Sequence, residues 1–200
     1  FHMPDAGVAH NLVIVKIRKS YPGQGKKVIS SLLGAGQMMF TKYLVVVSGD
    51  LEIRDYSQVL DHVFRNTTFK KDLLFLSGPL DVLDHTSDIL ALGGKLGVDA
   101  TIKLDEEMPV TGSQYSSVGG KMIVESLNQA EDHQAVRKAK KEHAGKLDSD
   151  DIRLILAVDT AVDLKDMYQV AWQILGNSDP QRDAELISEN LLFIDGTAKA

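Results

Sequence analysis

The fold is decided by one stretch of the chain, Gly36-Gln37-Met38-Met39-Phe40-Thr41-Lys42-Tyr43-Leu44-Val45-Val46-Val47-Ser48-Gly49-Asp50. Its pattern predicts that a helix ends here, that a single lysine follows, and that an almost unbroken apolar run then begins. A run of β-branched residues with glycine on both sides is typical of a strand that is covered on both faces. The stretch therefore predicts an α/β fold with a mostly parallel sheet.

The two faces of this strand differ in chemistry. Since successive side chains of a strand point to opposite faces, one face is expected to carry Lys42, Leu44, Val46 and Ser48, and the other Tyr43, Val45 and Val47. A cation at one end and a hydroxyl at the other thus share one side of an otherwise apolar strand.

The composition sets limits on size and partners. The chain has 200 residues, 44% of them hydrophobic, and a formal net charge of -6. This size suits one α/β domain, with two small lobes as the alternative. The negative charge argues against nucleic acid or an anionic membrane as the main partner. The absence of cysteine excludes disulfides, Cys-ligated zinc and a Cys nucleophile, and is compatible with the cytoplasm, where we expect the protein.

Further elements follow from the apolar pattern. We expect strands at 11–17 and 73–77, and flanking helices at 26–37 and 56–66, the second one capped by Asp55. This is the βαβ rhythm of a parallel sheet. Residues 78–103 break the rhythm and predict a long loop, in which the glycines of Gly93-Gly94-Lys95-Leu96-Gly97 set a tight chain reversal.

The last fifty residues repeat the first half. Asp159–Val170 lies over Ser48–Val59 at a constant offset of 111. Two further echoes pair 73–76 with 191–194 and 99–103 with 195–199. We infer an internal duplication of a βαβ unit. The expected organisation is an α/β core at 1–103, an exposed insertion with a polar helix at 104–150, and a second, partial copy at 151–200, which is structural or an interaction surface.

Two motifs offer chemistry, each with a plainer alternative. Lys42 is either a surface lysine that extends to solvent or the partner of a phosphate or carboxylate. His85 lies in Asp84-His85-Thr86-Ser87-Asp88 and is either a proton shuttle between carboxylates or an ordinary loop histidine. A metal site formed by these residues has no recognised spacing.

A family resemblance rests on six motifs in order: His10–Val15, Tyr21-Pro22-Gly23, Gly36–Lys42, Gly78-Pro79-Leu80-Asp81, Leu83-Asp84-His85 and Gly97–Thr101. In order and spacing they resemble the C-terminal domain of the UbiD-type decarboxylases, over about residues 9–103. The segment after residue 103 departs from the shorter members. It suggests a longer branch, tied to menaquinone biosynthesis. Neither end of the chain resembles a natural terminus, so we expect an excerpt of a longer protein.

The resemblance implies a carboxy-lyase of ubiquinone or menaquinone biosynthesis. Such enzymes decarboxylate an aromatic or α,β-unsaturated acid without oxidation. They use prenylated FMN, with a divalent metal, usually manganese, at its phosphate. Their acid/base group belongs to preceding domains. We therefore assign no catalytic residue and no metal ligand to this chain, and expect it to be inactive alone. Its expected partners are the rest of its own chain, the acid substrate and further copies in a homo-oligomer.

The resemblance also implies roles for single residues. Lys42 reaches the cofactor phosphate, and Val46 and Ser48 line the substrate pocket. A loop closes over the same pocket, with the residues Asp84, His85, Thr86, Ser87, Ile89 and Leu90. The alternative is a non-catalytic dimerisation or interaction module without cofactor contact. A free-standing nucleotide-binding domain is a more distant alternative.

Overall fold

A computed structural model describes residues 1–7, 10–108, 120–129, 131–145 and 151–199. Two four-stranded sheets form the framework. The first has the spatial order β1 (Leu12–Ile17), β2 (Tyr43–Ser48), β4 (Leu92–Ala100) and β3 (Leu73–Pro79). The second has the order β5 (Lys121–Leu127), β6 (Ile152–Asp159), β8 (Leu191–Asp195) and β7 (Ala184–Ser188). In each sheet three strands are parallel and the last one is an antiparallel edge strand, which confirms the α/β class.

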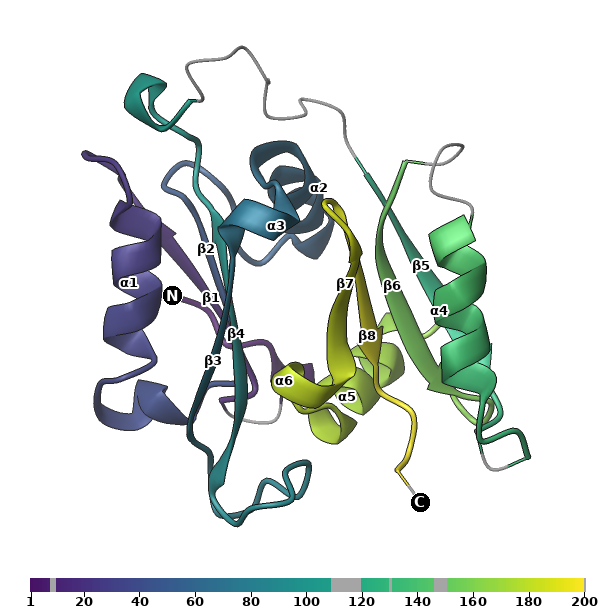
Figure 1. Cartoon of the computed structure of the whole chain (residues 1–200). Coiled ribbons are helices and arrows are strands. Elements are labelled where there is room, and N and C mark those ends of the chain that lie inside the picture. Colours follow the sequence, from purple (N-terminus) through teal and green to yellow (C-terminus); the bar gives the residue numbers. More distant parts are fainter. Residues whose placement is uncertain (8–9, 109–119, 130, 146–150, 200) are drawn as a thin grey trace.

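The helices form three layers around the sheets (Figure 1). The outer layers are α1 (Gln24–Leu32) on the first sheet and α4 (Ala135–Gly145) on the second. Between the sheets lie α2 (Tyr56–Asn66), α3 (Phe69–Asp72), α5 (Met167–Asn177) and α6 (Pro180–Asp183). Three short 3-10 helices complete the described elements, η1 (Asp5–Gly7), η2 (Gly36–Phe40) and η3 (Asp105–Glu107).

The expected alternation of β2 is confirmed within the strand. Leu44 and Val46 pack with Ile29 of α1 in an outer core. Tyr43 and Val47 face the central core, which draws buried side chains from both sheets. Because β2 is covered on both faces, an uninterrupted apolar run is needed there.

The duplication is visible in the helices between the sheets. The bounds of α2 and α5 differ by 111 residues at both ends, and so do those of α3 and α6. The helix caps repeat as well: Asp55 accepts a hydrogen bond from Gln58 N, and Asp166 accepts one from Gln169 N. The chain therefore contains two copies of one βαβ-based unit, here called the first and the second repeat.

A buried ion-pair network also occurs twice. In the first repeat, Lys103 Nζ lies 3.1 Å from Asp72 and 3.7 Å from Asp99. In the second, Lys199 Nζ lies 3.6 Å from Asp183 and 2.6 Å from Asp195. This network accounts for the echo between 99–103 and 195–199, because each repeat places one lysine between two carboxylates that the fold buries; in the second repeat Arg182 also pairs with Asp183.

Two expectations about the repeat are corrected. The second repeat begins at β5, ahead of residue 151, because 121–127 pairs with β6 as β1 pairs with β2, and α4 covers the sheet as α1 does. The polar helix is thus part of the second repeat. The echo between 73–76 and 191–194 is wrong, since the first segment is an edge strand and the second a central one. The Gly/Ser-rich piece at 112–119 lies outside the described residues.

The expected loop at 78–103 is largely a β-hairpin. Its strands β3 and β4 are joined by a connecting loop at 80–91, and Gly93–Gly97 lies inside β4 instead of forming a chain reversal. The glycines are needed for packing: a Cβ on Gly94 would overlap Asp179 and the backbone of Gln181, and one on Gly97 would overlap Ile29. Helices of both repeats therefore approach the backbone of β4 directly.

We predict that Gly94→Ala destabilises the protein by about 1–3 kcal/mol, because the added methyl group must displace backbone atoms of α6. The control is Gly176→Ala in α5, where a Cβ meets open space and should stabilise the helix by about 0.5–1 kcal/mol. Chemical denaturation measures both changes. An unchanged stability of Gly94→Ala would contradict this account of the glycine strand.

Candidate functional site

Lys42 precedes β2 and its side chain has no exposed surface. Its ammonium group lies 2.8 Å from Asp84 Oδ2 and donates to Thr86 Oγ1 at 3.4 Å and to the Ser178 carbonyl at 3.1 Å. Asp84 and Thr86 come from the connecting loop at 80–91, and Ser178 follows α5 of the second repeat. Lys42 is therefore not a surface lysine, and three distant segments meet at its charge.

Burial shifts the pKa values of this ion pair. Loss of hydration lowers the pKa of Lys42 below its usual value, and Asp84 offsets part of that effect. Burial alone would raise the pKa of Asp84, but hydrogen bonds from Lys42 and Thr86 outweigh it and hold that pKa below its usual range. Asp84 is thus a carboxylate that faces a dehydrated cation.

A second buried lysine lies near this pair. Lys95 of β4 is 1% exposed, and its ammonium group donates to the carbonyls of Met39, at 2.5 Å, and Thr41, at 2.9 Å. Burial lowers its pKa to about 8, with the charges of Asp84 and Lys42 acting in opposite directions. Two lysines and one carboxylate therefore share a dry region beside the start of β2.

Arg153 occupies the position in the second repeat that Lys42 has in the first, at the same offset of 111. It is 6% exposed and donates to the carbonyls of Phe64 and Thr67, both at 2.9 Å, and of Asn190 at 2.8 Å. Its guanidinium also lies over the rings of Phe64 and Phe69. Lys42 therefore binds the end of α5 in the second repeat, and Arg153 binds the end of α2 in the first.

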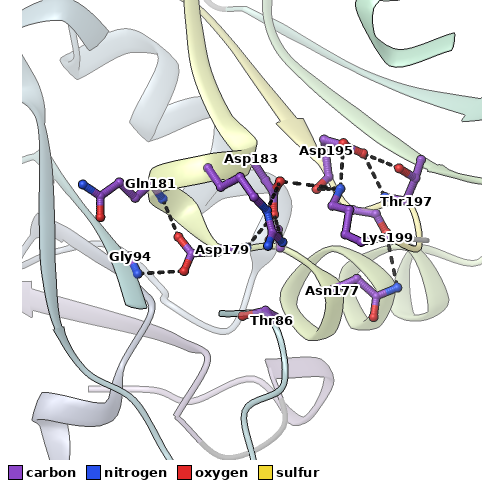
Figure 2. A network of polar contacts seen from close by, with 12 residues as sticks. Thr86, Gly94, Asn177, Asp179, Gln181, Asp183, Asp195, Thr197 and Lys199 are labelled. Atoms are coloured by element: carbon purple, nitrogen blue, oxygen red, sulfur yellow. Dashed lines mark hydrogen bonds and ion pairs between the residues drawn. The ribbon is translucent and has the colours of Figure 1, made fainter. Parts of the chain in front are cut away.

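The second repeat also supplies a carboxylate close to the lysines. Asp179 accepts hydrogen bonds from Gly94 N at 2.9 Å and Gln181 N at 2.8 Å, so it joins β4 to the first turn of α6 (Figure 2). Its charge raises the pKa of Lys42, against the larger effect of burial. The backbone N–H of Asp179 donates to Asp183 Oδ2 at 2.7 Å, so the same network continues to Asp195 and Lys199 (Figure 2).

The structure separates the predicted loop residues into three groups. Asp84 and Thr86 turn inward to Lys42. Ser87 is half-buried and donates to the Leu92 carbonyl. The remaining three are exposed: His85, Ile89 at 60% and Leu90 at 81%. Among the described residues, His85 makes no hydrogen bond or ion pair with either neighbouring carboxylate.

Val46 and Ser48 lie further along β2, away from Lys42. Val46 has no exposed surface and packs in the outer core under α1. Ser48 ends the strand, and its hydroxyl accepts a hydrogen bond from Ile102 N at 2.8 Å. Only the loop residues Asp84 and Thr86 are therefore brought into contact with Lys42.

Sequence reasoning missed the contributions of the second repeat. The offset of 111 that pairs α2 with α5 also pairs Lys42 with Arg153 and Thr67 with Ser178. It could have identified two equivalent cations. It could not show that each of them binds the other repeat.

In the described ranges, no group of three or more His, Asp or Glu side chains is arranged to hold a metal ion. None of the helices described is both long and apolar enough to cross a membrane.

We predict a pH-dependent stability effect of Lys95. Its pKa is about 8 in the folded protein and about 10.4 in an unfolded chain. Between these values the unfolded chain binds more protons at this site, so the free energy of unfolding rises with pH. The stability difference between Lys95→Met and wild type should therefore change between about pH 8 and pH 10, and be constant below. Lys16→Met, at an exposed lysine, is the control. A difference independent of pH would contradict the prediction.

Comparison with known proteins identifies relatives over the whole chain. A protein of Helicobacter pylori is 31% identical over all of this chain, which covers 35% of that protein. A protein of Aquifex aeolicus is 41% identical over 54% of this chain and 22% of its own length. The chain thus spans about a third or less of these relatives.

Solved structures give weaker likenesses. The UbiD-class enzyme HmfF from Pelotomaculum thermopropionicum, in complex with FMN, is 24% identical with a TM-score of 0.48, over 58% of this chain and 25% of that one. Vanillic acid decarboxylase of Sedimentibacter hydroxybenzoicus is 20% identical with a TM-score of 0.46, over 63% and 25%.

The family comparison covers both repeats. Residues 1–100 and 108–195 match the sequence model of one protein family. The match includes the segment at 121–145, which the sequence pattern predicts to be part of an insertion. This chain belongs to the family of 3-octaprenyl-4-hydroxybenzoate carboxy-lyase C-terminal domains.

Proposed function

We propose that the chain is the C-terminal domain of a carboxy-lyase that decarboxylates an aromatic or α,β-unsaturated acid without oxidation. The proposed setting is quinone biosynthesis in the cytoplasm. The observation that carries the proposal is the buried ammonium group of Lys42, held by an acidic loop within a chain of this family. A dehydrated cation is stabilised by an anion close to it, so this position is suited to bind one.

The proposed cofactor is prenylated FMN with manganese at its phosphate. When bound, this group supplies the decarboxylation chemistry, and the catalytic acid and the metal ligands come from the rest of the protein. Residues 1–103 would carry the cofactor contact and the second repeat would support it, in a homo-oligomer of the full-length chain. The role left to this chain is to hold one end of the cofactor and to cover the substrate.

The fit of Lys42 to a phosphate depends on Asp84. An ammonium group has three donors, and those of Lys42 face Asp84, Thr86 and Ser178. A phosphate oxygen therefore binds Lys42 only by replacing one of these acceptors. The Asp84 carboxylate is negatively charged, as phosphate is, so it is the acceptor that a phosphate would replace. Nearby in the chain, Thr41 Oγ1 is buried without a hydrogen-bond partner among the described residues. This hydroxyl is a further donor for a ligand oxygen.

The loop is suited to cover a substrate. Its exposed apolar residues include Leu83, Ile89 and Leu90. They can exclude water from a substrate held by a neighbouring domain, while Asp84 and Thr86 connect the loop to the cofactor end of the site. Val46 and Ser48 remain predicted pocket residues, and Val46 needs a rearrangement of α1 to reach a substrate.

A second candidate function is a non-catalytic interaction module. It is favoured by one observation, that the contacts of Lys42 within the chain already satisfy its charge. In this account the two repeats form a rigid platform for assembly, without cofactor contact.

We predict that Lys42→Met in the full-length protein abolishes bound flavin and leaves the oligomer size unchanged. Flavin absorbance and light scattering measure the two quantities. Arg153→Met is a matched control, because it removes an equally buried cation from the equivalent helix end. Equal flavin loss in both variants would make the effect structural. Unchanged flavin with a broken oligomer in Lys42→Met would support the interaction module instead.

We predict that Asp84→Asn strengthens flavin binding by about tenfold, equal to about 1.4 kcal/mol, because a neutral amide competes less well with phosphate for Lys42. Titration of the full-length apoprotein with FMN measures the dissociation constant. Asp88→Asn, at an exposed carboxylate of the same loop, controls for net charge. Weaker binding in Asp84→Asn alone would mean that Asp84 positions the lysine and does not compete for it.

A further inference from the structure

A cavity of about 500 Å³ lies between the two repeats. One wall is formed by β2 and β4 of the first sheet and the other by β6 and β8 of the second, and residues of α2 and α5 also line the cavity. Its volume lies within the range of small-molecule sites. The cavity is separate from the contacts of Lys42, which does not line it.

The walls are apolar and mainly aliphatic. Leu96 and Val98 line the cavity from the first repeat, and Leu156 and Ile194 from the second. Apart from tyrosines, Asp5 is the one ionisable residue among the described residues that line it. The inner tyrosine, Tyr43, already bonds through its hydroxyl to Ser178 Oγ at 2.5 Å. Such walls exclude a phosphate, a sugar or a nucleotide as the ligand.

The cavity reaches solvent at the first turns of α2 and α5. Tyr56, Met167 and Tyr168 line it and are 52%, 44% and 57% exposed. The hydroxyl of Tyr56 is hydrogen-bonded to His2 Nε2 at 2.8 Å. Tyrosine combines an apolar ring with a polar tip, so this rim suits a ligand whose apolar part enters while a polar end stays in water.

A cavity of this size offers room for a ligand, since protein interiors otherwise contain few voids larger than a water molecule. Cavities with apolar walls stay dry and bind apolar molecules. We propose that the space between the repeats binds one long aliphatic chain, of the fatty-acyl or isoprenoid kind, with its polar end at Tyr56 and Tyr168. The second repeat then completes a ligand site that a single repeat cannot form, because half of the wall comes from each.

The test uses the full-length protein and cis-parinaric acid, a fluorescent polyene fatty acid. We expect saturable binding of one molecule per chain. Excess FMN should not displace it, which separates this cavity from a flavin site. Palmitic acid and geranylgeraniol serve as competitors, and the stronger of the two identifies the source of the chain.

Variants link the binding to the cavity. Ala171→Trp places a large side chain in the space and should weaken binding at least tenfold. Val82→Trp adds the same side chain at a position that is 70% exposed and should leave binding unchanged. Met167→Glu, at the exposed rim, weakens binding without repacking the interior and is decisive if Ala171→Trp does not fold. No saturable binding to the wild type, or binding unaffected by the rim and cavity variants that fold, would overturn the proposal.

Discussion

Two buried cations hold the repeats against each other. Lys42 donates to the carbonyl that follows α5, and Arg153 donates to carbonyls at the end of α2. Each cation thus binds the carboxyl end of a helix in the other repeat, where the helix dipole is negative. Separation of the repeats would leave dehydrated charges and carbonyls without partners, which is costly. This exchange of contacts joins the two sheets, together with the core that both of them build.

This exchange makes the second repeat part of the site and of the core. It brings Ser178 to Lys42 and α6 to the backbone of β4, where Asp179 binds Gly94 N. It also sets the two sheets face to face, so that one central core is built from both. The apolar cavity lies between the same elements, and residues of both sheets and of α2 and α5 line it.

The repeats share a scaffold and differ at the connection between their antiparallel strands. The first has the loop at 80–91, which supplies Asp84 to its cation, whereas the second has the short turn at 189–190, which supplies Asn190 to Arg153. The partner of Lys42 is thus a carboxylate, whereas Arg153 is held by neutral carbonyl and amide oxygens. The proposed cofactor contact therefore lies in the first repeat alone, although both repeats belong to the family.

The sequence alone was sufficient for some features. The run at 43–48 determined a buried strand and Asp55 determined a helix start, because these signals depend on neighbouring residues. The offset of 111 determined the duplication, because two copies of one unit keep similar residues in the same order. Tertiary structure decided the rest. The glycines of β4 have meaning only once α1 and α6 pack on that strand, and the polar appearance of 121–145 concealed a sheet edge with its covering helix. The partners of Lys42 lie 42 to 136 residues away in the chain, at Asp84 and Ser178, and no local pattern reports such contacts, because folding alone brings those groups together.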